Sequence, residues 1–275
     1  MLHHHISLQY LNNDSLQKIQ MQSRTVGIPD FSRALTQYDD LCKTLSDLGA
    51  TVSVLPCHTS WLSRFAVMAG RLAIIGRTTD KEIESRYSTI ASVLAGDSIL
   101  KFIEEPGIVD GRDVVRVGET FLIGLSDTTN YEGASQLALY LTEAGWQAQL
   151  VDSLPASDIH LQDHILDIGE NRVIVSDLIE KHYALIAYDK VVIEYRENII
   201  PNAIALNGTV IIASGFIDQE QRLVQNNVRI VPVNLSEFAK LGIALNNLTL
   251  QTVGKPETSE KLKKEISETH LKKQA

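Results

Sequence analysis

The sequence predicts an α/β fold of about five strand–turn–strand–helix–strand units arranged as a closed ring. Two observations lead to this prediction. The same order of elements recurs along the chain, and a strand left over near the C-terminal end can complete the first unit. The 275 residues are 44% hydrophobic and 21% charged, which suits a sizeable core. A closed ring is expected because it leaves no sheet edge exposed. A plain doubly wound sheet is the alternative.

The clearest unit lies in the middle of the chain. Residues 113–117 and 121–125 have the pattern of two strands, and Gly118 between them tolerates the positive φ that hairpin turns require. Apolar residues then recur at helical spacing across residues 130–144. Residues 147–151 are expected to form the strand that closes the unit.

Three more units follow the same order of elements. Their hairpin strands are predicted at residues 65–68 and 72–75, 165–168 and 172–175, and 203–206 and 209–213. Their helices are predicted at residues 80–94, 177–187 and 217–226, and their closing strands at residues 99–103, 191–195 and 229–233. The first unit contains a strand at 3–10, a helix at 31–47 and a strand at 51–55, and takes its missing strand from residues 245–253.

The ends of this pattern set the domain boundaries. We expect one domain over residues 1–254 and a polar helical or frayed tail over 255–275, where favourable Glu–Lys pairs accompany only a thin apolar stripe. The polar segment 12–25 has few apolar anchors and is expected to be a free loop or a contact site.

Charge and cysteine usage exclude several classes of function. The net charge of -9 and the pI of about 5.4 disfavour nucleic-acid binding, because an acidic surface repels phosphate backbones. Two cysteines make no disulfide framework, and the sequence contains neither a secretory signal nor an apolar run long enough to span a bilayer. We therefore expect a cytoplasmic protein without membrane insertion and without a cofactor.

Short motifs in this frame resemble those of the dimethylarginine dimethylaminohydrolases and, at the first motif, the arginine deiminases. The matching segments run in the family's order between about residues 50 and 250. They are VDGRD (109–113), FLIGLS (121–126), TN (129–130), GA (133–134), IHL (159–161), NAIALN (202–207) and VPVNLSE (231–237). The resemblance implies the pentein fold, an α/β-propeller of five units about a pseudo-fivefold axis.

The resemblance also implies a chemistry. Family members attack a guanidinium carbon with a cysteine thiolate, while a histidine handles protons and carboxylates hold the cation. Asp110 matches the aspartate that holds the guanidinium, and His160 matches the acid–base histidine. Without the motif context, Asp110 would be a turn residue and His160 a satisfied polar group.

Other positions depart from the family. Asn246 occupies the expected nucleophile position, with Asn247 beside it, and an amide is not a nucleophile at neutral pH. Met68 stands where the family has acidic contacts, and Thr128 stands where it has an arginine for the substrate carboxylate. Arg112 replaces a glycine, so we expect it to pair with Asp110 or Asp113 and fill the cleft, leaving Asp110, His160 and Arg112 as a remnant ligand pocket.

The remaining candidates are given less weight. Arg77 can match a further family arginine, although an exposed structural arginine explains it equally well. Cys42 is expected to fill space in a helix, and Cys57 is expected to be an inert loop thiol. No metal site is expected, because His58, His160 and His164 lack a ligand spacing.

These departures lead to an expectation about function. The chain is expected to be a catalytically inactive pentein-fold pseudoenzyme that binds protein partners as a structural subunit of a larger bacterial multiprotein assembly. One alternative is an active amidinohydrolase that acts on arginine or methylarginine by a substituted mechanism, which the retained Asp110 and His160 favour. A second alternative is a sensor for a small ligand, since the vacated pocket could still bind a polar, uncharged compound. A small guanidino ligand is given less weight.

Overall fold

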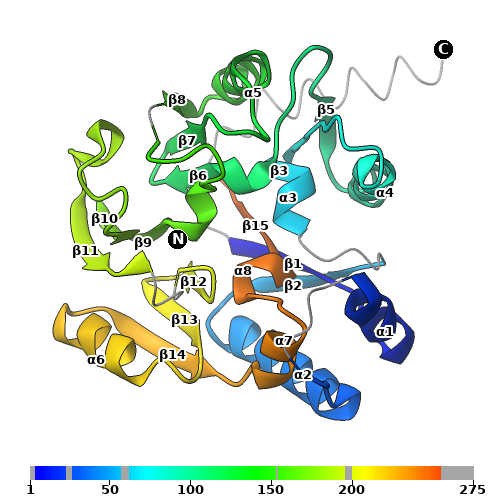
Figure 1. Cartoon of the computed structure of the whole chain (residues 1–275), viewed down its shortest axis with the longest axis vertical. Coiled ribbons are helices and arrows are strands. Elements are labelled where there is room, and N and C mark those ends of the chain that lie inside the picture. Colours follow the sequence, from blue (N-terminus) through cyan, green and yellow to red (C-terminus); the bar gives the residue numbers. More distant parts are fainter. Residues whose placement is uncertain (1–3, 23–26, 57–61, 153, 196–199, 255–275) are drawn as a thin grey trace.

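Five three-stranded sheets surround a common axis (Figure 1). The computed structural model describes residues 4–22, 27–56, 62–152, 154–195 and 200–254. In each sheet the inner strand runs antiparallel to the middle strand, and the middle strand runs parallel to the outer one. The predicted pentein α/β-propeller of five ββαβ units is therefore confirmed.

The fifteen strands fall into three rings. The inner strands are β3 (Ala66–Ala69), β6 (Val114–Val117), β9 (Ile165–Gly169), β12 (Ala203–Leu206) and β15 (Thr249–Val253). The middle strands are β4 (Leu72–Ile75), β7 (Thr120–Gly124), β10 (Arg172–Ser176), β13 (Thr209–Ala213) and β1 (His4–Gln9). The outer strands are β5 (Ile99–Phe102), β8 (Gln147–Val151), β11 (Asp189–Ile193), β14 (Arg229–Val233) and β2 (Thr51–Leu55).

The two ends of the described chain close the ring. β1 pairs in parallel with β2 and antiparallel with β15, with Ile6 opposite Gln251. The prediction that the last strand completes the first unit is thus confirmed. Closure gives β1 its second neighbour, so that every middle strand is paired on both sides. The middle strands β4 and β13 are apolar at nearly every position and buried throughout.

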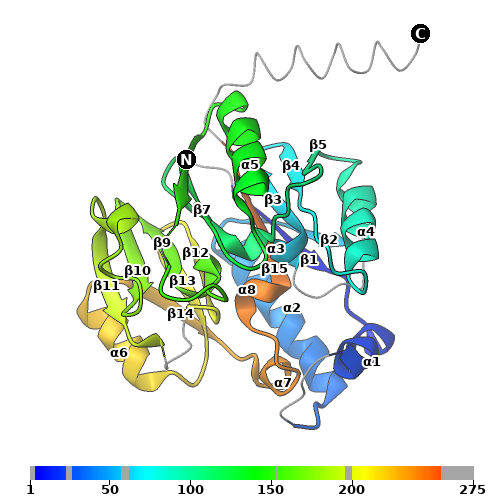
Figure 2. The same cartoon turned by 45° about the horizontal axis from the view of Figure 1, so that its top comes forward.

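Four helices pack on the units as connections between middle and outer strands. They are α2 (Phe31–Asp47), α4 (Glu84–Leu94), α5 (Tyr131–Glu143) and α6 (Ile217–Gln225) (Figure 2). Asp30 and Asn130 cap α2 and α5, since each side chain accepts a hydrogen bond from a backbone N–H three residues later. α4 begins at Glu84 rather than at the predicted residue 80, because Asp80 first forms a turn in which its carboxylate accepts the Glu82 N–H.

The predicted helix at residues 177–187 is wrong. Only the 3₁₀ turn η3 (Tyr183–Leu185) forms there. The His182 ring explains the break: Nε2 donates to the Asp152 carbonyl at 2.8 Å, and Nδ1 accepts the Ala184 N–H at 3.3 Å. This anchoring to the preceding strand competes with helical hydrogen bonds.

The segment near residue 12 also differs from expectation. It contains the helix α1 (Asn13–Gln22), although the sequence predicted a loop. Asn12 caps this helix by accepting the Ser15 N–H at 2.8 Å, and Leu16 is fully buried in the core of the first unit. The thin apolar pattern did not reveal this buried anchor. The predicted tail at 255–275 lies outside the described residues.

Short helical turns precede four of the five inner strands and mark one end of the ring. These turns are α3 (Leu62–Phe65) before β3, η1 (Gly111–Asp113) before β6, η2 (Leu161–Asp163) before β9 and α8 (Leu245–Leu248) before β15. Another short helix, α7 (Ser236–Lys240), packs on α2. α3 contacts both η1 and α8, and Figures 1 and 2 show α3 and α8 near the centre of the ring. None of the helices in the described parts of the chain is long and apolar enough to cross a membrane.

Candidate active site

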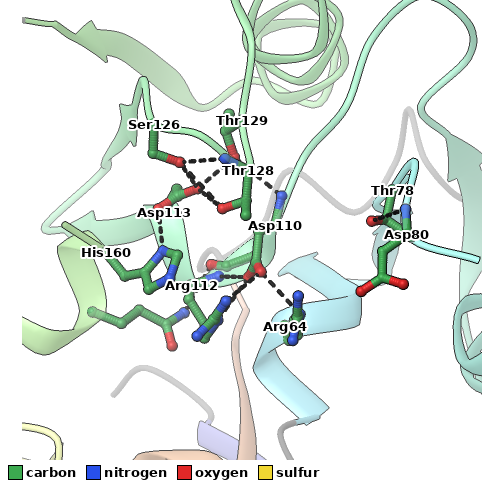
Figure 3. Close-up of polar contacts among 12 residues, drawn as sticks. Arg64, Thr78, Asp80, Asp110, Arg112, Asp113, Ser126, Thr128, Thr129 and His160 are labelled. Atoms are coloured by element: carbon green, nitrogen blue, oxygen red, sulfur yellow. Dashed lines mark hydrogen bonds and ion pairs between the residues drawn. The ribbon is translucent and has the colours of Figure 1, made fainter. Parts of the chain in front are cut away.

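Asp113 is the buried centre of a hydroxyl cluster (Figure 3). It ends η1 just before β6, and the turn after β7 lies beside it because β6 and β7 are antiparallel partners. Its Oδ2 accepts hydrogen bonds from the hydroxyls of Ser126 at 2.7 Å, Thr128 at 3.1 Å and Thr129 at 2.6 Å. Three donors on one oxygen hold the carboxylate in a single orientation.

The other oxygen of Asp113 orients His160. His160 Nδ1 lies 2.7 Å from Asp113 Oδ1, so the ring donates its Nδ1 proton to the carboxylate. The His160 side chain is 15% exposed, whereas that of Asp113 is 0% exposed. The ring therefore links the buried carboxylate to the solvent side, with Nε2 left to exchange a proton with a bound molecule. This is the arrangement of a histidine that serves as a general acid and base.

Asp110, at the other end of the same turn, is paired with two arginines (Figure 3). Arg112 makes a fork with Nε 3.0 Å from Oδ1 and Nη2 2.7 Å from Oδ2, and its backbone N–H also donates to Oδ1 at 3.0 Å. Arg64, from α3, places Nε 3.0 Å from Oδ2. Burial lowers the pKa of Arg112, but the hydrogen bond and charge of Asp110 outweigh this effect and raise it. Of the two partners predicted for Arg112, the structure selects Asp110.

Asp163 and Asn246 bring the expected nucleophile position to the same site. Burial raises the pKa of Asp163, opposed by the charges of His160 and Arg112 and by a hydrogen bond from the Asn246 side chain. The Asn246 N–H donates to the Pro201 carbonyl at 3.0 Å, which fixes the start of α8 beside the segment that leads into β12. No described residue provides a hydrogen-bond partner for the buried Asn246 Oδ1.

A cavity of about 160 Å³ lies along the axis beneath these turns. All five inner strands contribute to its wall, with Gln162 and Asn246 at the site end. Gln162 donates to the carbonyls of Gly111 at 3.0 Å and Val114 at 3.2 Å, which ties η2 to η1. Met68 lines this cavity, so the residue in place of the family's acidic contacts faces the axis.

The other predicted positions have structural partners. Thr128 supports Asp113, as described above. Arg77 donates to the Gly107 carbonyl at 3.1 Å and forms an ion pair with Glu105. His164 is buried, bonded to Ser176 and stacked on a tyrosine ring. Within the described ranges, no three His, Cys, Asp or Glu side chains gather in a way that could hold a metal ion.

Cys42 stands apart from this geometry. Cys42 is half-buried on α2 and packs against the core of the first unit, and burial raises the pKa of its thiol. Its predicted role as a space-filling residue fits these contacts. Cys57 and His58 lie outside the described residues.

Several site residues escaped sequence reasoning. These are Arg64, Asp113, Ser126, Thr129 and Asp163. One signal was present in the sequence. Three of the four residues from Ser126 to Thr129 carry hydroxyls, and this segment comes just after β7. The hairpin partner of β7 is β6, which begins immediately after Asp113. Arg64 carried no comparable signal, because its contact joins two different units.

Comparison with known proteins agrees with the fold. The chain is 24% identical over 240 residues to a dimethylarginine dimethylaminohydrolase of Pseudomonas aeruginosa, covering 84% of this chain and 93% of the relative. It is 29% identical over 153 residues to the enzyme of the same name from Streptomyces coelicolor, covering 53% and 58% of the two chains. No family model matches the sequence.

Solved structures share the fold. A Pseudomonas aeruginosa dimethylarginine dimethylaminohydrolase, a cysteine-to-serine mutant complexed with citrulline, superposes with a TM-score of 0.75 at 22% identity, covering 91% of this chain and 99% of that one. The N-terminal domain of a cyanobacterial arginine dihydrolase gives 0.68 at 14% identity, covering 90% and 97%. An amidinotransferase from Microseira wollei gives 0.66 at 14% identity, covering 90% and 93%.

The five-unit ring and these matches define the class of fold: the chain has the pentein fold that the solved structures share, and its sequence is similar to those of dimethylarginine dimethylaminohydrolases. The two relatives compared by sequence are dimethylarginine dimethylaminohydrolases, and the structures that share the fold include an arginine dihydrolase and an amidinotransferase.

The expectation of an inactive, protein-binding pseudoenzyme is contradicted. The relative that matches 84% of the chain is a hydrolase, and the solved structures with the same fold are enzymes. The expectation rested on positions that differ from the family, namely Met68, Thr128 and Asn246. It overlooked the complete Asp113–His160 pair, which supports acid–base chemistry whatever the nucleophile.

Proposed function

We propose that the chain is a hydrolase that cleaves a carbon–nitrogen bond at the amidino carbon of a guanidino compound, with arginine or an N-methylated arginine as substrate. The observation that carries the proposal is the 2.7 Å contact between His160 Nδ1 and the buried Asp113 carboxylate. The relatives named as dimethylarginine dimethylaminohydrolases and the arginine dihydrolase supply the substrate class.

Water is the proposed nucleophile. His160 Nε2 takes a proton as the water oxygen bonds to the amidino carbon, which forms a tetrahedral intermediate. The bond from that carbon to the departing nitrogen then breaks, and the same His160 proton passes to the amine. The hydroxyl proton of the intermediate leaves with the departing nitrogen, so the products are a ureido compound and a protonated amine or ammonium ion, and the enzyme returns to its starting protonation state.

Asp113 has a distinct task in this scheme. It touches no substrate, so it is a positioning residue that holds the His160 ring in the tautomer with a free Nε2. The negative carboxylate also stabilises the imidazolium that forms when the ring takes the proton. Ser126, Thr128 and Thr129 hold the carboxylate through neutral hydroxyls, which leaves its charge available to the ring.

Asn246 fits water as the nucleophile better than it fits covalent catalysis. Its amide cannot attack a guanidinium carbon, but a buried Oδ1 without a described partner can accept a hydrogen bond from water. Asp163 beside it has a pKa raised by burial, so it is a second group able to share a proton near the reacting atoms.

The test is product formation from L-arginine and from its N-methylated forms, measured as citrulline and as released amine or ammonia. The proposal predicts turnover by the native chain that His160→Ala removes. Asp113→Asn keeps the shape of the side chain but can present an amide to His160, and is expected to lower kcat by about a hundredfold to ten-thousandfold.

Two controls make the result specific. Arg71→Ala alters an exposed residue in the β3–β4 turn and is expected to leave turnover unchanged. Near-ultraviolet circular dichroism of the His160→Ala protein shows whether the fold survives. Absence of turnover with every guanidino compound at millimolar concentration, from folded native protein, contradicts the proposal.

A further inference from the structure

Asp110 already holds a guanidinium group, and that group belongs to the chain itself. Arg112 approaches the carboxylate through Nε at 3.0 Å and Nη2 at 2.7 Å, one nitrogen to each oxygen. This two-point fork is the geometry in which carboxylates bind guanidinium groups in general. The carboxylate that the family resemblance assigns to the guanidinium group of the substrate is therefore occupied in the structure.

The two arginines on Asp110 differ in how they are held. Arg112 lies on the short turn η1, two residues after Asp110. Its side chain contacts Asp110 only through the two hydrogen bonds of the fork. Arg64 comes from α3 in another unit and reaches only Oδ2. Their side chains are 21% and 23% exposed, whereas that of Asp110 is 2% exposed, so both guanidinium groups lie between the carboxylate and the solvent side.

We propose that Arg112 is a specificity-determining residue that acts as an internal competitor for the guanidinium site at Asp110. A guanidino ligand binds there by exchanging with the Arg112 fork, guanidinium for guanidinium. This inference rests on the proposed function, because it takes a guanidino compound as the ligand of Asp110.

The exchange is feasible because Asp110 keeps other partners when the fork opens. The backbone N–H of Arg112 still donates to Oδ1 at 3.0 Å, and Arg64 still balances the charge from 3.0 Å. The incoming guanidinium then replaces like with like, so no buried carboxylate is left unpaired. The displaced Arg112 side chain has a path outward, since it is already partly exposed.

Competition of this kind selects among ligands. A bare guanidinium ion forms with Asp110 only the interactions that Arg112 loses, so the net free energy of binding is small and the ion binds weakly. A ligand with further contacts, such as an amino acid with its own charged groups, gains enough elsewhere to displace the arginine. The apparent dissociation constant rises by the inverse of the fraction of molecules in which Asp110 is free.

The experiment measures binding of L-arginine and of methylguanidinium by isothermal titration calorimetry. The proteins compared are the native chain, Arg112→Ala, Arg112→Lys and the control Arg71→Ala. We expect Arg112→Ala to bind both probes at least about tenfold more tightly, corresponding to a carboxylate free in about a tenth of native molecules. Arg112→Lys removes the fork but keeps the charge, so its affinity for the probes is expected to lie between those of the native chain and Arg112→Ala. The control Arg71→Ala is expected to bind the probes with native affinity.

The outcomes separate this inference from the proposed function. Equal or weaker binding by both folded Arg112 variants overturns the inference, even if the native chain turns over arginine. Tighter binding by Arg112→Ala supports the inference, even if no variant produces citrulline and the proposed function fails. Should Arg112→Ala not fold, as judged by its circular dichroism, the same comparison with Arg112→Lys decides: tighter binding supports the inference and unchanged binding overturns it.

Discussion

Two buried aspartates flank one 3₁₀ turn and have opposite environments (Figure 3). Asp110 is 1% exposed and Asp113 is 0% exposed, so burial does not distinguish them. Asp110 meets the guanidinium groups of Arg64 and Arg112, whereas Asp113 meets three hydroxyls and His160.

The difference lies in where the charge goes. Two cations neutralise Asp110 and block access to it, which makes it a binding group that must first be vacated. Hydroxyls hold Asp113 without cancelling its charge, so that charge acts on the imidazole. Asp113, held by neutral donors, can therefore support proton transfer at His160. Asp110, held by cations, can only replace one bound cation by another.

The largest expected effect is on the catalytic side of this comparison. Asp113→Asn is expected to lower kcat by about two to four orders of magnitude, because the amide can stabilise the wrong tautomer of His160. Steady-state assays with the best guanidino substrate measure it. Asp110→Asn serves as the contrast and is expected to raise KM more than it lowers kcat. If Asp113→Asn mainly changes KM, the two aspartates do not divide the work in this way.

The next effect is on stability. Asp110→Ala leaves two partly buried guanidinium groups without their carboxylate and is expected to cost about 3–5 kcal/mol in free energy of unfolding. Urea denaturation of Asp110→Ala, Arg112→Ala and the double variant gives the coupling energy. The variant that combines Asp110→Ala with Arg112→Ala is expected to be at least as stable as Asp110→Ala alone. Strictly additive losses would mean that the fork contributes nothing.

A pH-dependent change in stability, of similar or smaller size, is expected from His164, which lies at the opposite end of η2 from His160. Burial, and then the charge of His160, lower its pKa from 6.5 to about 4. Between these values the unfolded chain binds a proton that the native chain does not, so stability falls as the pH falls from 6.5 towards 4. At full effect the loss is about 3 kcal/mol.

Chemical denaturation at pH 7, 5.5 and 4.5 measures this loss, with His164→Gln as the matched variant. The difference between native chain and variant should change with pH in the direction given, while carboxylates elsewhere affect both proteins alike. An unchanged difference across this range would show that His164 titrates normally.

The smallest effect expected is at one of the hydroxyls. Thr128→Val removes the longest of the three hydrogen bonds to Asp113, at 3.1 Å, and is expected to cost about 1 kcal/mol in free energy of unfolding. Thermal unfolding measures it, with Thr142→Val as control because that hydroxyl bonds only within its own helix. A cost at Thr128 no greater than at Thr142 would mean that the hydroxyls do not act together.

Much of the fold followed from local patterns in the sequence. Paired strands, tight turns at Gly118 and Gly208, and the leftover strand at the C-terminal end were enough for the ring and its closure. The helix expected at 177–187 failed because a single side chain, His182, bonds to the preceding strand. Hydrophobic periodicity does not detect such a contact.

The site was only half predictable for a related reason. Asp110 and His160 stood in recognisable motifs, but which aspartate faces the histidine depends on the path of η1. Arg64 lies in another unit, 46 positions before Asp110 in the chain, and forms an ion pair with it. Contacts between units are set by the ring, so they became visible only once the five sheets were in place.

In the proposed mechanism His160 and Asp113, rather than a thiol, carry the chemistry. Citrulline formation by a cysteine-free variant, Cys42→Ser with Cys57→Ser, tests it most directly when measured beside the native chain and His160→Ala. We expect the cysteine-free protein to keep native turnover and His160→Ala to lose it. Turnover that disappears with the cysteines, or that survives His160→Ala, would contradict it.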